Sequence, residues 1–495
     1  MGDPSSGYSN PVIPGFHPDP SVCRVGDDYY LVTSTFTYFP GVPILHSRNL
    51  VDWTQIGNVL DRPSQLDFAE TRGWSSLGIY APTIRHHDGR FWMITTNVTN
   101  LGTRSFFVTA EDPAGPWSDP APIAINGVDP DLAWVDGECW VHHSDFGIVR
   151  VRIDETNGEL LSEPERTWSG TGLQYPEAPH VFERDGTWYL LIAEGGTRHG
   201  HAVSIARGPS ILGPWEGCPS NPIVSHRSTD RPIQATGHAD LVEATDGSWW
   251  MILLGVRSRG IGSGFHVLGR ETFLAPVDWR DGWPEVASLD LEMPTRPPGP
   301  KASTESAVDD FDSAALAPTW MAVRRLPDEI SSLASRPGWL TVAGTTATLD
   351  DEEPVLVARR QQHQQCRVRT LVDADPSVEA GLTVYMDETS HYEVAVQGDQ
   401  VVARARLGTI VHVLGASVRP DGPVVLRVET RLDPHGPDVV VLGFESGAGA
   451  FQELGSLDGR YLSTEVIGGF TGRVIGMYAV GGDAAFDWFD YSEAE

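Results

Sequence analysis

The sequence contains few cysteines and no long apolar run. Its 495 residues include only Cys23, Cys139, Cys218 and Cys366, and no pair of them has a CxxC spacing. Dispersed thiols in a large chain favour a reducing compartment over a disulfide framework. The chain contains no stretch of 18 apolar residues, so no transmembrane helix is predicted. The first residues lack the basic and apolar regions of a signal peptide. We therefore expect a cytoplasmic protein.

Basic residues are also scarce. The chain has 35 Lys and Arg against 67 Asp and Glu, which gives a formal net charge of −32. A surface this acidic repels phosphate groups, so neither nucleic acid nor an anionic membrane is a predicted partner. The hydrophobic content of 40% is ample for packed interiors, and the length favours two or three domains. The sequence leaves open whether the chain forms homo-oligomers.

A repeat runs through the first part of the chain. Each copy has a short strand, a turn with Asp or Gly and an aromatic-rich strand, as in "DPSVCRVGDDYYLVTST" and "APHVFERDGTWYLLIAE". Such turns supply the positive φ that tight hairpins need, and the flanking β-branched and aromatic residues favour strands. The copies begin at Asp19, Ala81, Asp129, Ala178 and His238.

Two further strands are predicted after each hairpin. The third strand is, for example, "VPILHSR" in the first copy and "FHVLGRE" in the fifth, and the fourth often opens with Trp. The third copy is weaker here, with "LLSEPERTW". Four strands per unit of roughly 50 residues is typical of a β-propeller blade. We predict a five-bladed β-propeller over residues 1–295, with a β-sandwich of repeated hairpins as the weaker alternative.

The repeat gathers acidic residues at one place. In a propeller the innermost strand of each blade lines a central channel, so the five starting residues should surround one channel mouth. Asp19, Asp129 and Glu177, which precedes Ala178, then converge from three blades. Each acid alone would be a turn residue, because Asp before Pro commonly begins turns. Matching positions in separate repeats instead indicate a divalent-cation site or a carboxyl pair that cleaves a glycosidic bond.

The C-terminal part follows a Pro-, Ser- and Thr-rich linker predicted at residues 296–306. Residues 307–495 contain short alternating strands such as "CRVRTLVDA" and "VVLRVETR", separated by regular turns. This pattern predicts a β-sandwich, so the expected fold class is all-β. The aromatic strand "FDWFDY" near the end is expected to close a sheet.

Motifs across the whole chain resemble glycoside hydrolase family 43, in particular its two-domain β-xylosidases and α-L-arabinofuranosidases. They are "NPVIPGFHPDPSVCRVGDDYYLVTSTF", "YAPTIRHHDGRFWMI", "GVDPDLAW", "YPEAPHVFERDGTWYLLIAEGGT", "TGHADLVE" and "LGRETF". The resemblance implies that Asp19 is a general base that activates water and Glu177 a general acid. It makes Asp129 a third carboxylate that raises the pKa of the acid, and Arg270 a substrate contact that keeps the base ionised.

The resemblance also implies an inverting mechanism and names three residues around the sugar. Phe36 matches an aromatic wall of the pocket, and His238 a channel histidine that often holds water or calcium. Tyr80 in "SLGIYAP" departs from the family's "GGIWAP", and "FTYFPG" departs from "FEWFPG". Both changes lie in the expected sugar pocket. No cofactor is required for the expected reaction, although a structural calcium ion in the channel remains an alternative.

The function that the converging acids and the resemblance together imply is exo-acting release of xylose from β-1,4-xylo-oligosaccharides, and the resemblance implies a concanavalin- or jelly-roll-like sandwich packed beside the active site. The alternatives are an α-L-arabinofuranosidase, a non-catalytic carbohydrate-binding propeller and, more weakly, a retaining fructosidase. Zinc is disfavoured at His142 and His143, because adjacent strand residues point to opposite faces. His201 is expected at the pocket mouth or on the surface, and Glu194 is expected to shape a loop.

Overall fold

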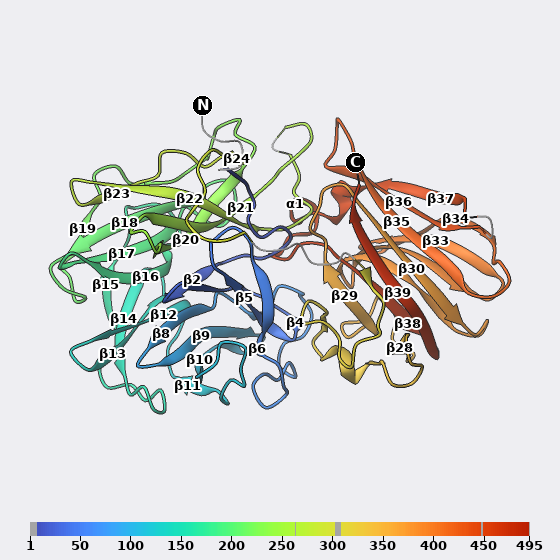
Figure 1. The fold of residues 1–495 in the computed structure, drawn as a ribbon, viewed down its shortest axis with the longest axis horizontal. Helices are drawn as coiled ribbons and strands as arrows, with labels where there is room; N and C mark the ends of the chain where they lie inside the picture. Colours follow the sequence, from blue (N-terminus) through green and yellow to red (C-terminus); the bar gives the residue numbers. More distant parts are fainter. Residues whose placement is uncertain (1–6, 263, 302–307, 447–448, 495) are drawn as a thin grey trace.

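The computed structural model describes residues 7–262, 264–301, 308–446 and 449–494. Figure 1 shows two bodies side by side, one running from blue to yellow-green and one from yellow to red. Nearly all regular structure is strand; the helical segments are η1 (Pro327–Glu329), η2 (Gly459–Leu462) and α1 (Thr464–Ile467). In the part of the chain that is described, no helix has the length and apolarity to cross a membrane.

Five antiparallel sheets form the first body. From the channel outward, blade 1 has β2 (Ser21–Val25), β3 (Asp28–Val32), β5 (Gly41–Ser47) and β6 (Thr54–Leu60), and blade 2 has β8 (Thr83–His87), β9 (Arg90–Thr99), β10 (Gly102–Ala110) and β11 (Ala121–Ile123), with β7 (Gly78–Ile79) beside β9. In the same order, blade 3 has β12 (Val128–Val135), β13 (Glu138–Ser144), β14 (Ile148–Ile153) and β15 (Glu165–Trp168), and blade 4 has β16 (Glu177–Arg184), β17 (Thr187–Glu194), β18 (Ala202–Gly208) and β19 (Glu216–Gly217). Blade 5 has β20 (Gln234–Glu243), β21 (Trp249–Val256), β22 (Glu271–Arg280) and β23 (Trp283–Glu285). Each blade's first strand contacts the first strand of the next, and β20 contacts β2, so the ring is closed.

The hydrophobic core of the propeller is divided among the junctions between blades. One cluster lies between each neighbouring pair, and every blade contributes apolar residues from its inner strands to both sides. Burial of apolar surface at these five junctions holds each blade against its two neighbours, because both faces of each blade's sheet must be covered.

The segment before the first blade completes the ring. Strand β1 (Tyr8–Ser9) pairs with β24 (Glu292–Met293), which follows the last blade. Ile13 forms a two-way backbone bridge with Thr272, and the Asn10 side chain pairs with both backbone groups of Leu274. The N-terminal segment therefore binds the fifth blade and supports the start of the first.

The third strand of blade 5 is not where the sequence predicted it. The strand is β22 (Glu271–Arg280), whereas "FHVLGRE" at residues 265–271 forms a connection that reaches toward the second body. Gly264 and Gly269 adopt φ of 72° and 79°, which breaks the extended conformation on both sides of the predicted strand. The prediction was wrong because the aliphatic content of this segment serves contacts between domains rather than a blade.

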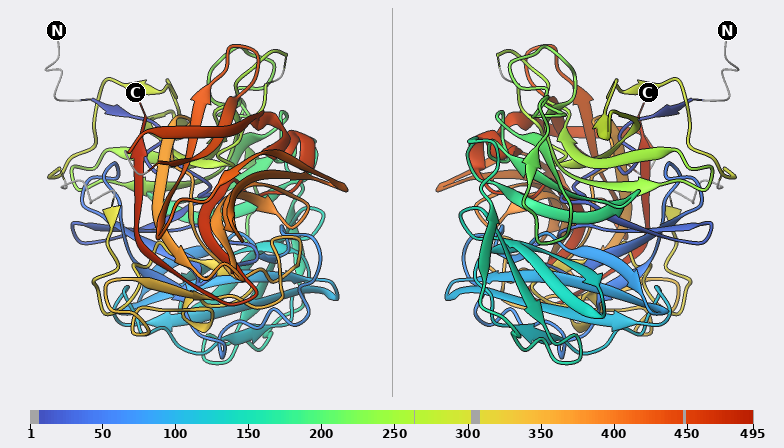
Figure 2. Two further views of the ribbon diagram at one scale, coloured as in Figure 1. Left: turned by 90° about the vertical axis from the view of Figure 1, so that its right-hand side faces the viewer. Right: turned by 90° about the vertical axis from the view of Figure 1, so that its left-hand side faces the viewer.

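The second body is a sandwich of two antiparallel sheets. One sheet has the order β27 (Ser331–Ser332), β28 (Leu340–Ala343), β39 (Asp483–Glu493), β30 (Cys366–Ala374), β35 (Val424–Leu432), β36 (Asp438–Glu445) and β37 (Phe451–Asp458), with β25 (Val308–Asp309) beside β39. The other has the order β29 (Leu356–Arg360), β38 (Val474–Val480), β31 (Glu379–Asp387), β32 (Ser390–Gln397), β33 (Gln400–Leu407) and β34 (Ile410–Val418). Figure 2 shows these orange and red sheets stacked and curved, seen end-on. The all-β prediction of a propeller followed by a sandwich is confirmed.

The aromatic strand "FDWFDY" lies inside its sheet instead of at an edge. It belongs to β39, which pairs with β28 on one side and β30 on the other. Phe486 and Phe489 are completely buried in the sandwich core, and their partner Trp320 packs edge-on against Phe489. A central position is the physical reason for the aromatic content, because an inner strand buries one whole face.

The two domains share a strand pair and an apolar core. Strand β4 (Tyr38–Phe39) of the propeller pairs with β26 (Ala322–Val323), which lies in the chain between β25 and β27 of the sandwich. The shared cluster joins aromatic residues of the propeller to aliphatic and aromatic residues of the C-terminal part: Phe16, Phe36, Tyr38, Met321, Val323, Leu356, Ala358, Tyr385, Val474 and Tyr478. This core fixes the sandwich against the end of the propeller near the predicted site.

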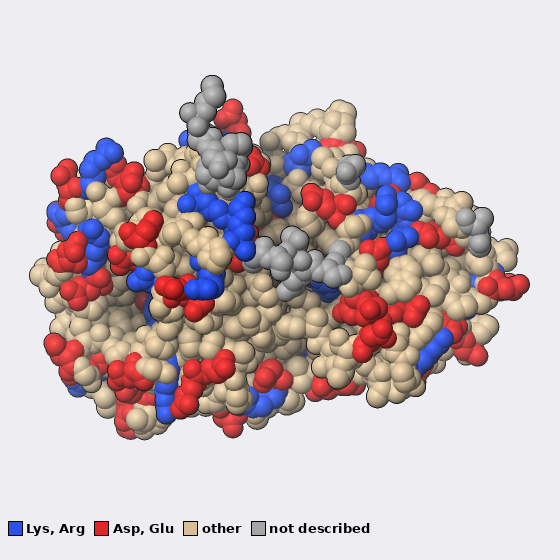
Figure 3. All heavy atoms as spheres, viewed as in Figure 1, with Lys and Arg blue, Asp and Glu red and all other residues tan. Residues whose placement is uncertain are grey.

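The segment between the two domains and the molecular surface bear on two earlier predictions. The predicted linker at residues 296–306 lies partly outside the described residues, since residues 302–307 are not described. Figure 3 shows acidic side chains spread over both domains with basic ones among them. This face matches the net charge of −32 and offers no extended basic stripe of the kind that binds nucleic acid.

Candidate active site

Four of the five starting residues of the repeat share an unusual backbone conformation. Asp19, Asp129, Ala178 and His238 all have positive φ, between 46° and 57°. A residue with a Cβ loses about 1–2 kcal/mol in this left-handed region, so four equivalent cases require support from surrounding packing. Asp19 lies two residues before its inner strand, Asp129 and Ala178 are the second residues of theirs, and His238 is the fifth. These positions, which the repeat makes equivalent in the sequence, therefore also share one backbone conformation.

Asp19 lies in a buried hydrogen-bond network. Its carboxylate accepts hydrogen bonds from Ser34 Oγ at 2.6 Å and from Arg270 Nη1 at 2.9 Å, and His238 Nδ1 lies 3.4 Å away. Burial alone would raise the pKa of Asp19, but the charge of Arg270 and the bond from Ser34 hold that pKa below its ordinary value. Asp19 is consequently ionised near neutral pH, which is the state that a general base needs.

Asp129 and Glu177 form a repelling pair on neighbouring blades. Ala178 donates a backbone hydrogen bond to Asp129 Oδ2 at 3.2 Å, which ties the Asp129 carboxyl to the residue next to Glu177. Burial, followed by the negative charges of Glu177 and Asp19, raises the pKa of Asp129 well above its ordinary value. The Glu177 side chain is the more accessible, with 25% of its surface exposed. The repulsion between the two carboxyls disfavours the state in which both are ionised.

His238 lies between the acids and stays uncharged. Burial lowers the pKa of its imidazole to about 4, although the charges of Asp19 and Glu177 act in the opposite direction. Because a neutral imidazole has one acceptor nitrogen and one donor nitrogen, His238 can bond the Asp19 carboxylate without neutralising it. The structure thus brings the predicted acids, Arg270 and His238 together at one channel mouth.

An aromatic wall stands beside these acids. Phe36 is buried and contacts Tyr80 edge-on, with ring centroids 5.6 Å apart. Phe470 from the sandwich stacks on Phe36 at 6.0 Å and meets Tyr80 at 5.9 Å. Burial raises the pKa of Tyr80 to about 12, so its hydroxyl keeps its proton and is available as a hydrogen-bond donor. Phe36 and Tyr80 therefore lie together as predicted, and Phe470 adds a third ring that the sequence did not single out.

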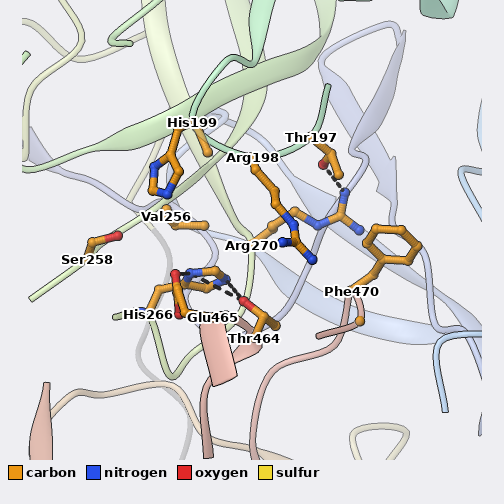
Figure 4. Close-up of a pocket in the computed structure, with 12 residues that line it drawn as sticks. Thr197, Arg198, His199, Val256, Ser258, His266, Arg270, Thr464, Glu465 and Phe470 are labelled. Atoms are coloured by element: carbon orange, nitrogen blue, oxygen red, sulfur yellow. Dashed lines mark hydrogen bonds and ion pairs between the residues drawn. The ribbon is translucent and has the colours of Figure 1, made fainter. Parts of the chain in front are cut away.

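Arg270 connects the acids to a cavity of about 290 Å³ between the domains. Its guanidinium binds Asp19 and Thr197 Oγ1 and lies 5.3 Å from the Phe470 ring centroid. Figure 4 shows Arg270 with Thr197 and Phe470 on one side of the cavity, and His266 with Glu465 and Thr464 on another. The lining residues are Thr197, Arg198, His199, Ala235, Val256, Ser258, His266, Arg270, Thr464, Glu465, Gly469 and Phe470.

Close backbone contact between the domains positions Arg270 and Phe470. A Cβ on Gly472 would lie 2.2 Å from the Leu268 carbonyl oxygen, so only glycine allows the two loops to approach this closely. The neighbouring Phe470 N–H donates to Ser76 Oγ at 2.8 Å. The sandwich was expected beside the active site, and the glycines around Phe470 in "GGFTGR" were the signal that would have identified the loop that reaches the pocket.

Below the acids the channel is filled by a second charged layer. Arg85 Nη2 lies 2.9 Å from Asp131 and 2.9 Å from His180 Nδ1, and Nη1 lies 2.9 Å from Asp240. Ser21 Oγ donates to Asp240 as well. Burial would raise the pKa of Asp240, but Arg85 lowers it to about 2. These residues come from all five inner strands, so the layer joins the blades and balances buried charge beneath the site.

The other histidines and the glutamate named from the sequence lie outside the acid cluster, with one exception. His142 and His143 are buried in β13 with pKa values lowered to about 4 by burial, and no group of three His, Cys, Asp or Glu suited to a metal occurs among the described residues. Glu194 accepts bonds from Thr171 and Ser204 and so holds a loop. His201 is the exception, because it is buried at 1% exposure and lies 3.6 Å from Glu177.

Two family models match the chain in the order of its domains. Residues 8–284 match the model described as glycosyl hydrolases family 43, and residues 308–492 match the β-xylosidase C-terminal concanavalin A-like domain. The chain belongs to glycoside hydrolase family 43. The predicted membership is confirmed, and this family-43 chain is a glycosidase whose two matched regions coincide with the propeller and the sandwich.

Relatives of this family-43 glycosidase match it along nearly its full length. A protein of Bacteroides ovatus named non-reducing end α-L-arabinofuranosidase BoGH43B is 38% identical, over 98% of this chain and 94% of that protein. A β-xylosidase of Bacillus subtilis is 34% identical over 86% of this chain and 85% of that protein. The crystal structure of a xylan β-1,4-xylosidase from Bacillus halodurans has 34% identity and a TM-score of 0.90, covering 98% of this chain and 100% of that one.

Proposed function

We propose that this glycosidase releases xylose from the non-reducing ends of β-1,4-xylo-oligosaccharides with inversion at the anomeric carbon. The observation that carries the proposal is an ionised Asp19, held by Arg270, at the same channel mouth as Asp129 and Glu177, whose mutual repulsion disfavours ionisation of both. Glycoside cleavage needs one carboxyl with its proton and one without it.

In the proposed reaction Asp19 takes a proton from a water molecule, whose oxygen attacks the anomeric carbon. The bond from that carbon to the leaving oxygen breaks, and Glu177 gives its proton to that oxygen. Asp19 and Glu177 come from blades 1 and 4, which are not neighbours, and acids on non-adjacent blades favour a gap that admits the attacking water. A gap of about 6.5–9.5 Å between carboxyls is the arrangement that suits inversion.

Exo action is supported by the contribution of the sandwich. Phe470 and Glu465 close one side of the cavity beside Arg270, and Phe36 and Tyr80 wall the sugar position. A chain end fits a site closed on one side, whereas a long polymer running through it would meet these residues. The reaction needs no cofactor, because side chains supply and accept both protons. A calcium ion in the channel stays an untested prediction, and Arg85 already places a cation beneath the acids.

The test is hydrolysis of 4-nitrophenyl β-D-xyloside and of xylobiose, followed by proton NMR of the first-formed xylose. We expect turnover of both compounds and initial appearance of the α-anomer, because one displacement inverts the β-bond. The related retaining outcome would show the β-anomer first. The proposal would be refuted if neither compound were hydrolysed above background.

An α-L-arabinofuranosidase is the second candidate, because the similar Bacteroides ovatus protein carries that name and Tyr80 stands where the family often has Trp. We expect Tyr80→Trp to change the ratio of kcat/KM on the 4-nitrophenyl β-D-xyloside to that on the α-L-arabinofuranoside by about 3–10-fold, as loss or gain of one pocket contact is worth about 1 kcal/mol. The ratio is insensitive to the amount of folded enzyme. A ratio unchanged in the variant would remove Tyr80 from sugar selection.

A further inference from the structure

His201 is a buried polar residue that the proposed mechanism leaves without a role. It immediately precedes β18, and its side chain is 1% exposed. Nε2 faces the Glu177 carboxyl at 3.6 Å and has no hydrogen-bond partner among the described residues. Buried polar atoms are almost always partnered, so an unpartnered one beside a functional carboxyl points to a partner that is made during the reaction.

The protonation of the His201 ring follows from its other nitrogen. Nδ1 lies 3.2 Å from the carbonyl oxygen of Ala235, which is an acceptor only. Nδ1 therefore carries the hydrogen, and in the neutral ring Nε2 is left as an acceptor. Ala235 is itself held with φ of 51°, a conformation that a residue with a Cβ rarely adopts and that aims this carbonyl at the ring. The backbone thus selects the tautomer that presents a lone pair to Glu177.

Packing fixes where the ring lies. A Cβ added to Gly237 would come within 2.4–2.5 Å of three atoms of the His201 imidazole, so the ring rests directly on the glycine backbone. Gly237 belongs to β20, immediately before His238, and links His201 to the blade that carries the channel histidine. The ring has no room to move toward blade 5, which leaves it facing Glu177 on blade 4.

We propose that His201 is a positioning residue whose unprotonated Nε2 accepts a hydrogen bond from the protonated Glu177 carboxyl. The inference rests on the proposed function, in which Glu177 is the acid. A separation of 3.6 Å exceeds a hydrogen bond, but rotation of the Glu177 side chain closes it, and contacts of catalytic groups commonly tighten when substrate binds. A bond accepted from the neutral carboxyl stabilises that form, so His201 keeps the proton on Glu177 until the leaving oxygen takes it.

Other charged groups face the same space, and they define the sign of the effect. Asp19 and Asp129 are acidic and favour the protonated Glu177, Arg270 is cationic and opposes it, and His238 is neutral. A neutral His201 acts with the two acids. A protonated His201 would act against them by pairing with the Glu177 carboxylate. Removing His201 therefore moves the titration of the acid in opposite directions under the two assignments.

The experiment compares the pH dependence of kcat/KM on xylobiose for the intact enzyme, His201→Leu and His201→Gln. We expect the alkaline limb of His201→Leu to move to lower pH by about one unit, since loss of one hydrogen bond to the neutral acid is of that order. His201→Gln keeps an acceptor oxygen and should restore part of the shift. Gly237→Ala leaves His201 in the chain but displaces its ring, and should move the limb in the same direction.

A purely structural role for His201 would lower the amount of active enzyme without moving the limb. An alkaline limb that is unmoved, or moved to higher pH, in His201→Leu and Gly237→Ala would overturn the proposal. If His201→Leu fails to fold, the two milder variants decide by the same criterion. Lack of xylose release by the intact enzyme would be a failure of the proposed function, which the intact-enzyme profile identifies separately.

Discussion

Glu177→Gln is expected to lower kcat on xylobiose by about 10²–10⁴-fold, the usual contribution of a positioned general acid. The amide has the same shape but no acidic proton, so the sugar leaving oxygen must depart unprotonated. The loss should be much smaller on 4-nitrophenyl β-D-xyloside, because nitrophenolate leaves readily without a proton. Steady-state kinetics on the two substrates measure this difference directly.

The control for this variant lies on the same strand. Glu183→Gln replaces an exposed glutamate of β16, six residues away, and should leave both rates within about twofold, as surface changes usually do. Equal losses on the two substrates would show that Glu177 does not protonate the leaving group. Full turnover of xylobiose by Glu177→Gln would eliminate the assignment altogether.

Asp438→Asn is expected to reduce the free energy of unfolding of the sandwich by about 3–5 kcal/mol, the cost of breaking a buried ion pair from one side. Asp438 and Arg473 are both completely buried, with guanidinium to carboxylate distances of 2.6 and 3.0 Å. The variant leaves the Arg473 charge in the interior without a counter-ion. Urea unfolding followed by fluorescence measures the change in the free energy of unfolding. The intact protein and the variant are fitted with the same m-value so that their midpoints can be compared.

The matched control is Asp399→Asn, which removes an exposed aspartate in the turn after β32 and should change stability by less than about 0.5 kcal/mol. Activity adds a second readout, because the Arg473 N–H bonds the Val267 carbonyl oxygen and Phe470 lies three residues before Arg473. Loosening this ion pair should therefore weaken xylobiose hydrolysis at temperatures below unfolding. An Asp438→Asn protein as stable as the Asp399→Asn control would contradict the prediction.

Local patterns explain why much of the propeller was predictable. The turns with Asp and Gly and the aromatic strands after them are short-range signals, and each inner strand begins close to the residue where the repeat placed it. "FHVLGRE" misled because an apolar run can cover a domain contact as well as a strand. Only the partner across the interface, Gly472 with its neighbours, distinguishes the two cases.

Charge placement was less accessible from the repeat. The converging acids followed from matching positions, but the strongly raised pKa of Asp129 depends on its depth and on two neighbouring carboxylates. Arg85, in contrast, occupies a strand position that in the sequence resembles any exposed basic residue, and it neutralises Asp131 and Asp240 only because the inner strands meet in a ring. Phe470 reaches the site from 200 residues beyond Arg270 in the chain.

By itself the sequence determined the strand-rich class, the order of the repeats and which acids begin the inner strands, because hydrogen-bonded hairpins and turns depend on neighbouring residues. The tertiary structure alone decided that His201 is buried against Glu177, that Arg85 fills the channel and that the sandwich completes the pocket. Those facts depend on contacts between residues far apart along the chain, and on how far burial removes their charges from water.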